Sequence, residues 1–182
     1  MNQTNSKLRI ATCSLAGCFG CHMSFLDMDE QLLELVELVE FNRSPLTDIK
    51  TLSHCHIGFV EGGLCNQENI EVLLNFRKHC DFLVAVGACA INGGVPAMRN
   101  SFSADQCLKE AYIDGMGIVD GQIPDDPELP TLLAKVLPIE SQVKIDCHLP
   151  GCPPPPAAFL EVVNAFHHNR PVNLDYDLRH FD

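Results

Sequence analysis

The chain has 182 residues, enough for one domain with a sizeable hydrophobic core. Its 24 acidic and 12 basic residues give a formal charge of −12 at pH 7, which argues against a nucleic-acid-binding surface. No apolar run approaches the roughly 20 residues that span a bilayer, and residues 1–9 carry neither a signal core nor a twin-arginine pair. We therefore expect a cytoplasmic protein whose ten cysteines serve as metal ligands, redox groups or buried packing residues rather than as disulfides.

The first half of the chain alternates strand-like and helix-like segments. Residues 7–12 predict a short strand, and the apolar spacing over residues 24–40 predicts one long helix with an acidic, solvated side. Residues 54–60 predict a buried strand that ends at E-G-G, and the amphipathic residues 66–79 predict a helix. The unbroken apolar run at residues 82–86 predicts the clearest strand of the sequence.

The second half is less regular. Glycine and proline are frequent in residues 93–127, which predicts loops with one short helix at residues 103–112. Residues 129–137 predict a helix, residues 143–149 a strand, and residues 157–168 a final helix. The alternation of strands and helices therefore extends over most of the chain.

This alternation predicts an α/β fold with a doubly wound, mostly parallel sheet and helices on both faces. We expect one domain over residues 1–169 and a polar tail over residues 170–182. In such sheets, ligands bind outside the carboxyl ends of the strands. Residues that directly follow the predicted strands are therefore the candidates for a functional site.

Four cysteines lie in three short segments, each at the point where a strand-like run gives way to a helix-like run. Cys18 and Cys21 form C-F-G-C, Cys89 lies in G-A-C-A, and Cys152 lies in P-G-C-P. Because all four follow predicted strands, the topology should bring them to one edge of the sheet. Soft thiolates select iron–sulfur clusters, zinc or copper(I). Four thiolates from three loops therefore indicate a metal or cluster cage.

The spacing of these cysteines favours a cluster, although four thiolates alone do not separate zinc from [4Fe–4S]. Structural zinc sites usually combine two close pairs, whereas here one pair is joined by two distant single cysteines. Pro153, directly after Cys152, is also typical of cluster-binding sequences. Glycines beside the cysteines, such as Gly20 and Gly87, let the backbone approach a bulky group and donate N–H groups to it.

Two other interpretations stay open at this point. C-x-x-C after a first strand is also the setting of a thioredoxin-like dithiol, which would use Cys18 and Cys21 and leave the other two cysteines unexplained. An FMN could bind at the same edge of the sheet, but residues 14–17 are weakly suited to cradle its phosphate. We expect any FMN on this chain to accompany the cluster rather than to replace it.

The other cysteines and the histidines near the predicted ligands have simpler interpretations. We expect packing roles for Cys55, Cys80 and Cys147, which lie in or beside apolar runs. Cys65 follows E-G-G-L, from where it could reach the edge of a cluster, but packing is again the favoured interpretation. His22 and His148 adjoin the ligand segments and could be ligands or hydrogen-bond donors to a sulfide, but we expect solvent-facing loop histidines.

The motifs together resemble the small subunit of [NiFe] hydrogenases. C-x-G-C near the start, E-G-G after the second long strand, V-G-A-C-A with G-G behind it, and P-G-C-P-P occur in the family's order over residues 7–168. The resemblance implies a flavodoxin-like domain in which a proximal [4Fe–4S] cluster is held by Cys18, Cys21, Cys89 and Cys152. It also implies that Glu61, the glutamate of the E-G motif, lies close to the cluster.

Within this family, the chain resembles the short, single-cluster subunits of cytoplasmic bidirectional NAD(P)-linked hydrogenases, because no cysteine follows Cys152. The resemblance implies a non-catalytic electron-relay subunit of a hydrogen:NAD+ oxidoreductase. Its partners would be the large subunit with the Ni–Fe centre and diaphorase subunits with FMN and Fe–S clusters. The nearest rival is the cluster-bearing subunit of respiratory complex I, whose first motif has two adjacent cysteines where Cys18 and Cys21 are separated.

Overall fold

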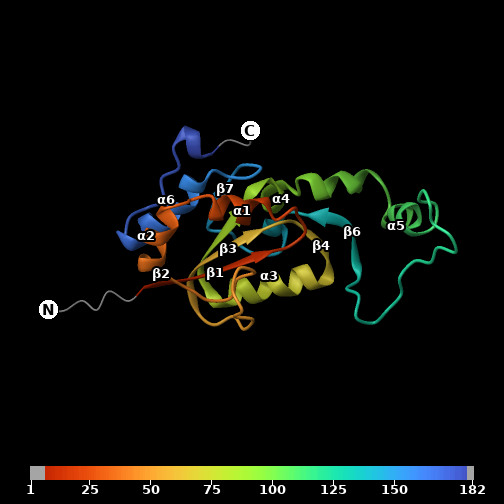
Figure 1. Cartoon of the computed structure of the whole chain (residues 1–182), viewed down its shortest axis with the longest axis horizontal. Helices are drawn as coiled ribbons and strands as arrows, with labels where there is room; N and C mark the ends of the chain where they lie inside the picture. The colour runs from red at the N-terminus through yellow and green to blue at the C-terminus, as the bar shows by residue number, and fades with distance from the viewer. Residues whose placement is uncertain (1–6, 180–182) are drawn as a thin grey trace.

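The computed structural model describes residues 7–179, so residues 1–6 of the expected domain and residues 180–182 of the expected tail lie outside it. Its centre is a parallel sheet of five strands in the order β2-β1-β3-β5-β7 (Figure 1). The strands are β1 (Leu8–Ser14), β2 (Val39–Phe41), β3 (Cys55–Glu61), β5 (Cys80–Val86) and β7 (Cys147–Leu149). Within the described residues, no helix has the length and apolar character that a membrane crossing needs.

The three central strands end together. In their register, Ser14 of β1 lies beside Glu61 of β3, and Glu61 lies beside Val86 of β5. The near-continuous apolar sequences of β3 and β5 suit strands that are covered on both faces. Val60 and Leu83 are accordingly fully buried. The expected doubly wound, mostly parallel α/β fold is confirmed.

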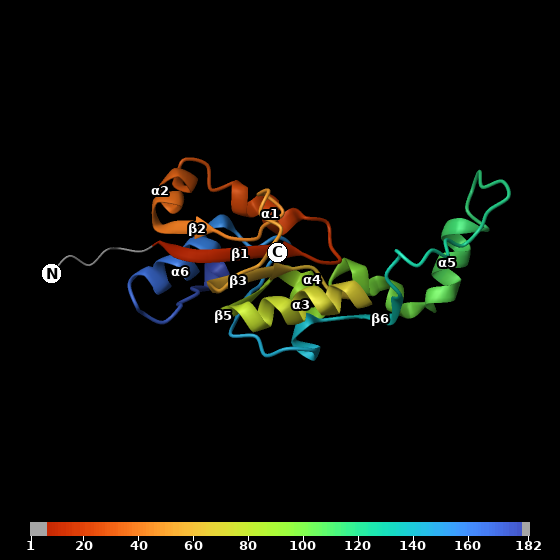
Figure 2. The same ribbon diagram turned by 90° about the horizontal axis from the view of Figure 1, so that it is seen from below.

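Helices cover both faces of this sheet (Figure 2). On one face lie α1 (Gly20–Leu26), α2 (Gln31–Leu38) and α6 (Pro156–His167), and on the other lie α3 (Gln67–His79) and α4 (Gly87–Asn92). On the first face, the rings of Phe25 and Phe159 pack edge to face with 5.4 Å between their centroids. On the second face, Leu73 and Phe76 of α3 are fully buried.

Helix α3 confirms the helix predicted at residues 66–79. Residues at its two ends favour a helix that starts and stops there. Asn66 is the N-cap, and its side chain accepts a hydrogen bond from the Asn69 N–H at 2.8 Å. The last turn holds Arg77, Lys78 and His79, which suit the negative end of the helix dipole.

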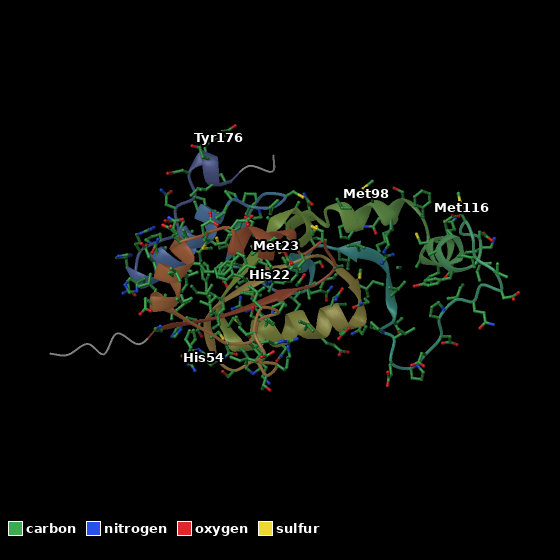
Figure 3. All side chains as sticks on the ribbon, in the orientation of Figure 1. His22, Met23, His54, Met98, Met116 and Tyr176 are labelled. Carbon is green, nitrogen blue, oxygen red and sulfur yellow. The ribbon has the colours of Figure 1, made fainter. Side chains whose placement is uncertain are left out.

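A two-stranded sheet leads into an arm that extends from the body (Figures 1 and 2). In this sheet, β4 (Leu64–Asn66) pairs antiparallel with β6 (Leu132–Leu137). The arm also contains the 3-10 helix η1 (Val95–Ser101) and α5 (Ala104–Tyr112). The helix predicted at residues 103–112 is confirmed as α5, which starts with a capping box formed by Ser103 and Gln106. Met98 and Met116 lie along the arm with exposed side chains (Figure 3).

The predicted single helix at residues 24–40 is wrong. α1 ends at Leu26 and α2 begins at Gln31, because the chain turns between them and Asp29 adopts a positive φ of 50°. Residues 39–41 leave the helical path and form β2, in which the buried Val39 pairs with Leu8. A pairing partner far along the chain thus overrides the local helical spacing.

The predicted helix at residues 129–137 is also wrong, since most of it forms strand β6. Short apolar runs suit either structure, and long-range hydrogen bonds decide here. The Asn100 side chain accepts from the Val136 N–H at 2.7 Å and donates to the Val136 carbonyl at 2.9 Å. The predicted strand at residues 143–149 is shorter than expected: β7 follows a 3-10 helix, η2 (Ile139–Ser141). The final predicted helix is confirmed as α6.

The described part of the expected tail lies against the body. The Arg170 guanidinium donates to both carboxylate oxygens of Glu161 on α6, each at 2.6 Å. Val172 and Leu174 pack against the apolar cluster around α6. A short 3-10 helix, η3 (Tyr176–Leu178), follows them.

Neighbouring leucines on α3 test this account of the core. Leu73 is fully buried, whereas Leu74 is 49% exposed. We expect Leu73→Ala to lower the free energy of unfolding by about 2–5 kcal/mol, because it removes packed atoms and leaves a cavity. Leu74→Ala, the matched control, should change it by less than about 0.5 kcal/mol. Urea denaturation followed by circular dichroism measures both values, and equal losses would contradict the packing described for α3.

Candidate metal centre

The loops that follow the parallel strands contact one another at the carboxyl edge of the sheet. After β1, the Ala16 N–H donates to the Gly63 carbonyl at 3.0 Å, and the Gly63 N–H returns a bond to Ala16 at 2.8 Å. Further along the edge, the Ala88 N–H donates to the Gly151 carbonyl at 2.9 Å. These bonds hold the loops with the predicted ligands in fixed positions.

The structure places all four predicted cysteines at this edge. Cys18 is exposed in the loop before α1, and Cys21 is half-buried in the first turn of that helix. Cys89 is half-buried in the first turn of α4, and Cys152 is exposed in the loop before α6. Helix amino termini carry partial positive charge, which favours thiolates and other anionic groups near them.

Glycines keep space free around the sulfurs. A Cβ atom added to Gly87 would lie 2.5 Å from Cys21 Sγ, and one added to Gly94 would lie 2.8 Å from Cys89 Sγ. Both glycines also have a positive φ, of 77° and 49°, which most other residues rarely adopt. A side chain at either position would therefore displace the neighbouring cysteine.

Electrostatic interactions connect the four sulfurs with one another. Burial is the main cause that raises the pKa of the Cys21 thiol, and the carboxylate of Glu61 adds to it. Burial likewise raises the pKa of Cys89. Smaller contributions come from the other cysteines: Cys89 and Cys18 act on Cys21, and Cys152 and Cys18 act on Cys89. A positively charged group beside Cys21 and Cys89 is needed to hold these two as thiolates.

The donor set fits an iron–sulfur cluster. Four thiolates are the usual ligands of a [4Fe–4S] cluster, and hydrogen bonds to the sulfurs tune it. Such a donor is present, because the Val95 N–H faces the sulfur of Cys89 and opposes the rise of its pKa. Across residues 7–179, no three His, Cys, Asp or Glu side chains stand as close together as the ligands of a single metal ion. The residues that would hold a cluster are Cys18, Cys21, Cys89 and Cys152.

Glu61 lies at this site, at the end of β3, and is only 3% exposed. Its Oε2 accepts a hydrogen bond from the backbone N–H of His22 at 3.2 Å, and its Oε1 lies 2.9 Å from Nδ1 of the same residue. Burial acts to raise the pKa of Glu61, but the contacts of its carboxylate with the side chains of His22 and Ser14 outweigh it, so the pKa is lowered. The carboxylate form is therefore favoured beside Cys21.

The expectation that His22 faces solvent is wrong. The residue is 5% exposed and lies in the middle of the body (Figure 3). Its Nε2 is 2.8 Å from Thr12 Oγ1, which in turn is 2.8 Å from Ser44 Oγ. The ring stacks on Phe19 with 4.6 Å between the centroids. Buried polar partners, all brought together by the fold, explain why this histidine is inside.

The remaining cysteines agree with packing roles. Cys55 and Cys80 are buried where β3 and β5 pair, as expected. Cys147 is half-buried against the apolar cluster around α6. Cys65 is half-buried, and its N–H and thiol both face the Asn69 side-chain oxygen, at 3.1 and 3.3 Å. In contrast to His22, His148 is partly exposed and lies 3.2 Å from a carboxylate oxygen of Glu140.

Sequence reasoning missed Thr12 and Ser44 as members of the site. Thr12 lies on a strand, where threonine is common, and Ser44 stands next to a proline that indicates only a turn. No local spacing links either residue to Glu61. The one signal in the sequence was Thr12 itself, a polar residue within a strand-like run, since a buried polar group needs a partner.

Comparison with known proteins identifies the family. The sequence profile of the NADH ubiquinone oxidoreductase 20 Kd subunit family matches residues 18–166. The chain belongs to this family. Within it, the chain is 48% identical over 180 residues to the NAD-reducing hydrogenase HoxS subunit delta of Cupriavidus necator, covering 97% of this chain and 86% of that subunit. The resemblance to hydrogenase small subunits is thereby confirmed.

Solved structures and more distant relatives agree. A chain in the crystal structure of NAD+-reducing [NiFe]-hydrogenase in the H2-reduced state matches with a TM-score of 0.94 and 48% identity, covering 97% of this chain and 99% of that one. A subunit of the F420-non-reducing hydrogenase of Methanothermobacter marburgensis is 34% identical over 92% of this chain, which spans 56% of that relative. The Ni-Fe-Se hydrogenase of Desulfomicrobium baculatum, with a TM-score of 0.61 and 17% identity over 96% of this chain and 69% of that one, shows only a shared fold.

Two glycines with the same backbone conformation test whether space at Gly87 matters for metal uptake. Gly117 has a φ of 82°, close to the 77° of Gly87, but an added Cβ there would meet nothing within 4 Å. We expect Gly87→Ala to lose most of the iron bound after anaerobic loading with iron and sulfide, because the new methyl group displaces Cys21. Gly117→Ala carries a similar backbone strain of about 1 kcal/mol and should keep its iron. Equal iron contents in the two variants would show that the space beside Cys21 is not needed.

Proposed function

We propose that the chain is the electron-transfer small subunit of an NAD-reducing [NiFe] hydrogenase and carries one [4Fe–4S] cluster. The observation that supports this most strongly is the meeting of four thiols at the ligand-binding edge of a parallel sheet. The 48% identity to a subunit of an NAD-reducing hydrogenase over nearly the whole chain agrees with it. A cytoplasmic location remains the prediction made from the sequence.

The residues of the chain have distinct parts in this function. When bound, the cluster would supply a one-electron carrier. Cys18, Cys21, Cys89 and Cys152 hold it as thiolates, and the Val95 N–H donates toward the sulfur of Cys89. Burial raises the pKa of Cys21 and Cys89, and the positive charge of iron would offset this rise and favour their thiolates.

The exposure of the site suits a relay between subunits. Cys18 and Cys152 are exposed, whereas Cys21 and Cys89 are half-buried. The site therefore opens at the surface, where a partner can approach it closely. We propose that electrons pass between a Ni–Fe centre on a large subunit and, on the other side, a diaphorase module with FMN and Fe–S clusters. On this account the cleavage of hydrogen takes place on the large subunit.

The thioredoxin-like alternative fits the site less well. Such a mechanism uses only a C-x-x-C pair, here the exposed Cys18 and the half-buried Cys21. It gives no role to Cys89 and Cys152, which lie at the same edge.

Serine substitutions separate the two functions. After anaerobic loading, we expect the full chain to bind about four irons, and Cys152→Ser to lose most of them. Cys107→Ser is the control, because Cys107 is not among the four predicted ligands and lies on α5 in the arm. Iron and sulfide assays together with a dithiol-exchange assay provide the measurements. Fewer than about three irons, bound zinc instead, or exchange activity that survives Cys152→Ser would count against the proposed function.

A further inference from the structure

A row of buried polar side chains, called the polar row below, leads from the candidate metal centre into the protein. The structure describes five buried polar residues. Four of them form the polar row: Thr12, His22, Ser44 and Glu61. It runs from Ser44 Oγ to Thr12 Oγ1 over 2.8 Å, to His22 Nε2 over 2.8 Å, and from His22 Nδ1 to Glu61 Oε1 over 2.9 Å. Burying four polar groups is costly unless they bind one another, so their clustering calls for an explanation.

The far end of the polar row, at Thr12 and Ser44, is anchored to the central sheet. Thr12 lies on β1, and its N–H donates to the Arg43 carbonyl at 2.9 Å. Ser44 is held in the loop after β2, where its hydroxyl accepts from the Leu46 N–H at 3.2 Å. The Phe19 ring stacks on the His22 ring with an interplanar angle of 7°. The imidazole is therefore restrained at one nitrogen and on one face.

At the near end of the polar row, His22 contacts both oxygens of the Glu61 carboxylate. The His22 backbone N–H donates to Oε2 at 3.2 Å, and the His22 ring stands 2.9 Å from Oε1. Within the described residues, no donor is aligned for a regular hydrogen bond to Oε1, so the ring holds this oxygen by close contact alone. Glu61 and Cys21 line one cavity and His22 directly follows Cys21, so these contacts hold the carboxylate beside a predicted cluster ligand.

We infer that His22, anchored by Thr12 and Ser44, is a positioning residue that fixes the Glu61 carboxylate beside Cys21, and that this fixed charge lowers the reduction potential of the bound cluster. The inference rests on the proposed function, because it requires a cluster on this chain. Reduction adds negative charge to the cluster, and a carboxylate held nearby in a poorly solvated site opposes that addition. A purely structural role for the four residues predicts no effect on the potential.

The effect of the charge itself is tested with Glu61→Gln. This substitution keeps the shape of the side chain and removes its charge. We expect the reduced-to-oxidised ratio of the cluster at a fixed potential to rise about tenfold, which is about 59 mV for a one-electron couple. The measurement is an EPR-monitored redox titration of the full chain, loaded anaerobically with iron and sulfide.

The positioning role is tested with Thr12→Val, which removes the hydroxyl that anchors His22 and keeps the branched shape. We expect the potential to rise, by less than in Glu61→Gln, because the ring and the carboxylate are free to move away from Cys21. Thr12→Ser restores a hydroxyl and should return the potential toward the original value. Thr47→Val is the control, since the Thr47 hydroxyl donates to the backbone carbonyls of Asn42 and Ser44, at 3.4 and 3.3 Å, and not to His22 or Glu61.

The double variant decides whether Thr12 acts through Glu61. In a chain that already carries Glu61→Gln, Thr12→Val should shift the potential no further, because the charge that it positions is gone. A full additional shift, or no shift in Thr12→Val alone, would overturn the inference. Should Thr12→Val fail to fold, Ser44→Ala takes its place in the same comparison, because it removes the hydroxyl that contacts Thr12.

Iron content, measured in every sample, keeps this test separate from that of the proposed function. If the unsubstituted chain binds no cluster, the proposed function fails and no potential exists to compare. If it binds a cluster whose potential is the same in Glu61→Gln, the proposed function stands and the inference about the Glu61 carboxylate is wrong.

Discussion

The structure depends on the parallel register of its central strands, which ends β1, β3 and β5 at one edge. Because the strands stop together, the loops that follow them meet and exchange backbone bonds, as Ala16 does with Gly63. The loops thereby bring cysteines that are far apart in the sequence close enough to raise one another's pKa. Glycines at the crossing points, above all Gly87, are needed because any side chain there would occupy the place of a sulfur.

The buried polar groups extend this site into the protein. A metal centre on loops alone would be held only by its ligands, whereas here Glu61 lies at the end of a central strand and His22 is fixed to β1 through Thr12. The central sheet therefore positions both the cysteine loops and the Glu61 carboxylate beside Cys21. The four predicted ligands and the Glu61 carboxylate thus share the central sheet as their support, as the proposed electron carrier would require.

Much of this could be predicted from the sequence, and the failures share a cause. The helix at residues 66–79 was predictable because Asn66 caps it locally, and the gathering of the cysteines followed from strand order alone. The strand at residues 39–41, by contrast, is fixed by pairing with β1, and His22 is buried by partners ten and 39 residues away. Local periodicity carries no information about such distant partners, so these features emerged only from the fold.

The central claim is that four thiolates at one sheet edge hold a single [4Fe–4S] cluster. Native mass spectrometry of the full chain, loaded anaerobically with iron and sulfide, tests it most directly. The account predicts a mass increase that corresponds to about four iron and four sulfide atoms per chain. An increase corresponding to one zinc ion, or to about two irons and two sulfides, would contradict it.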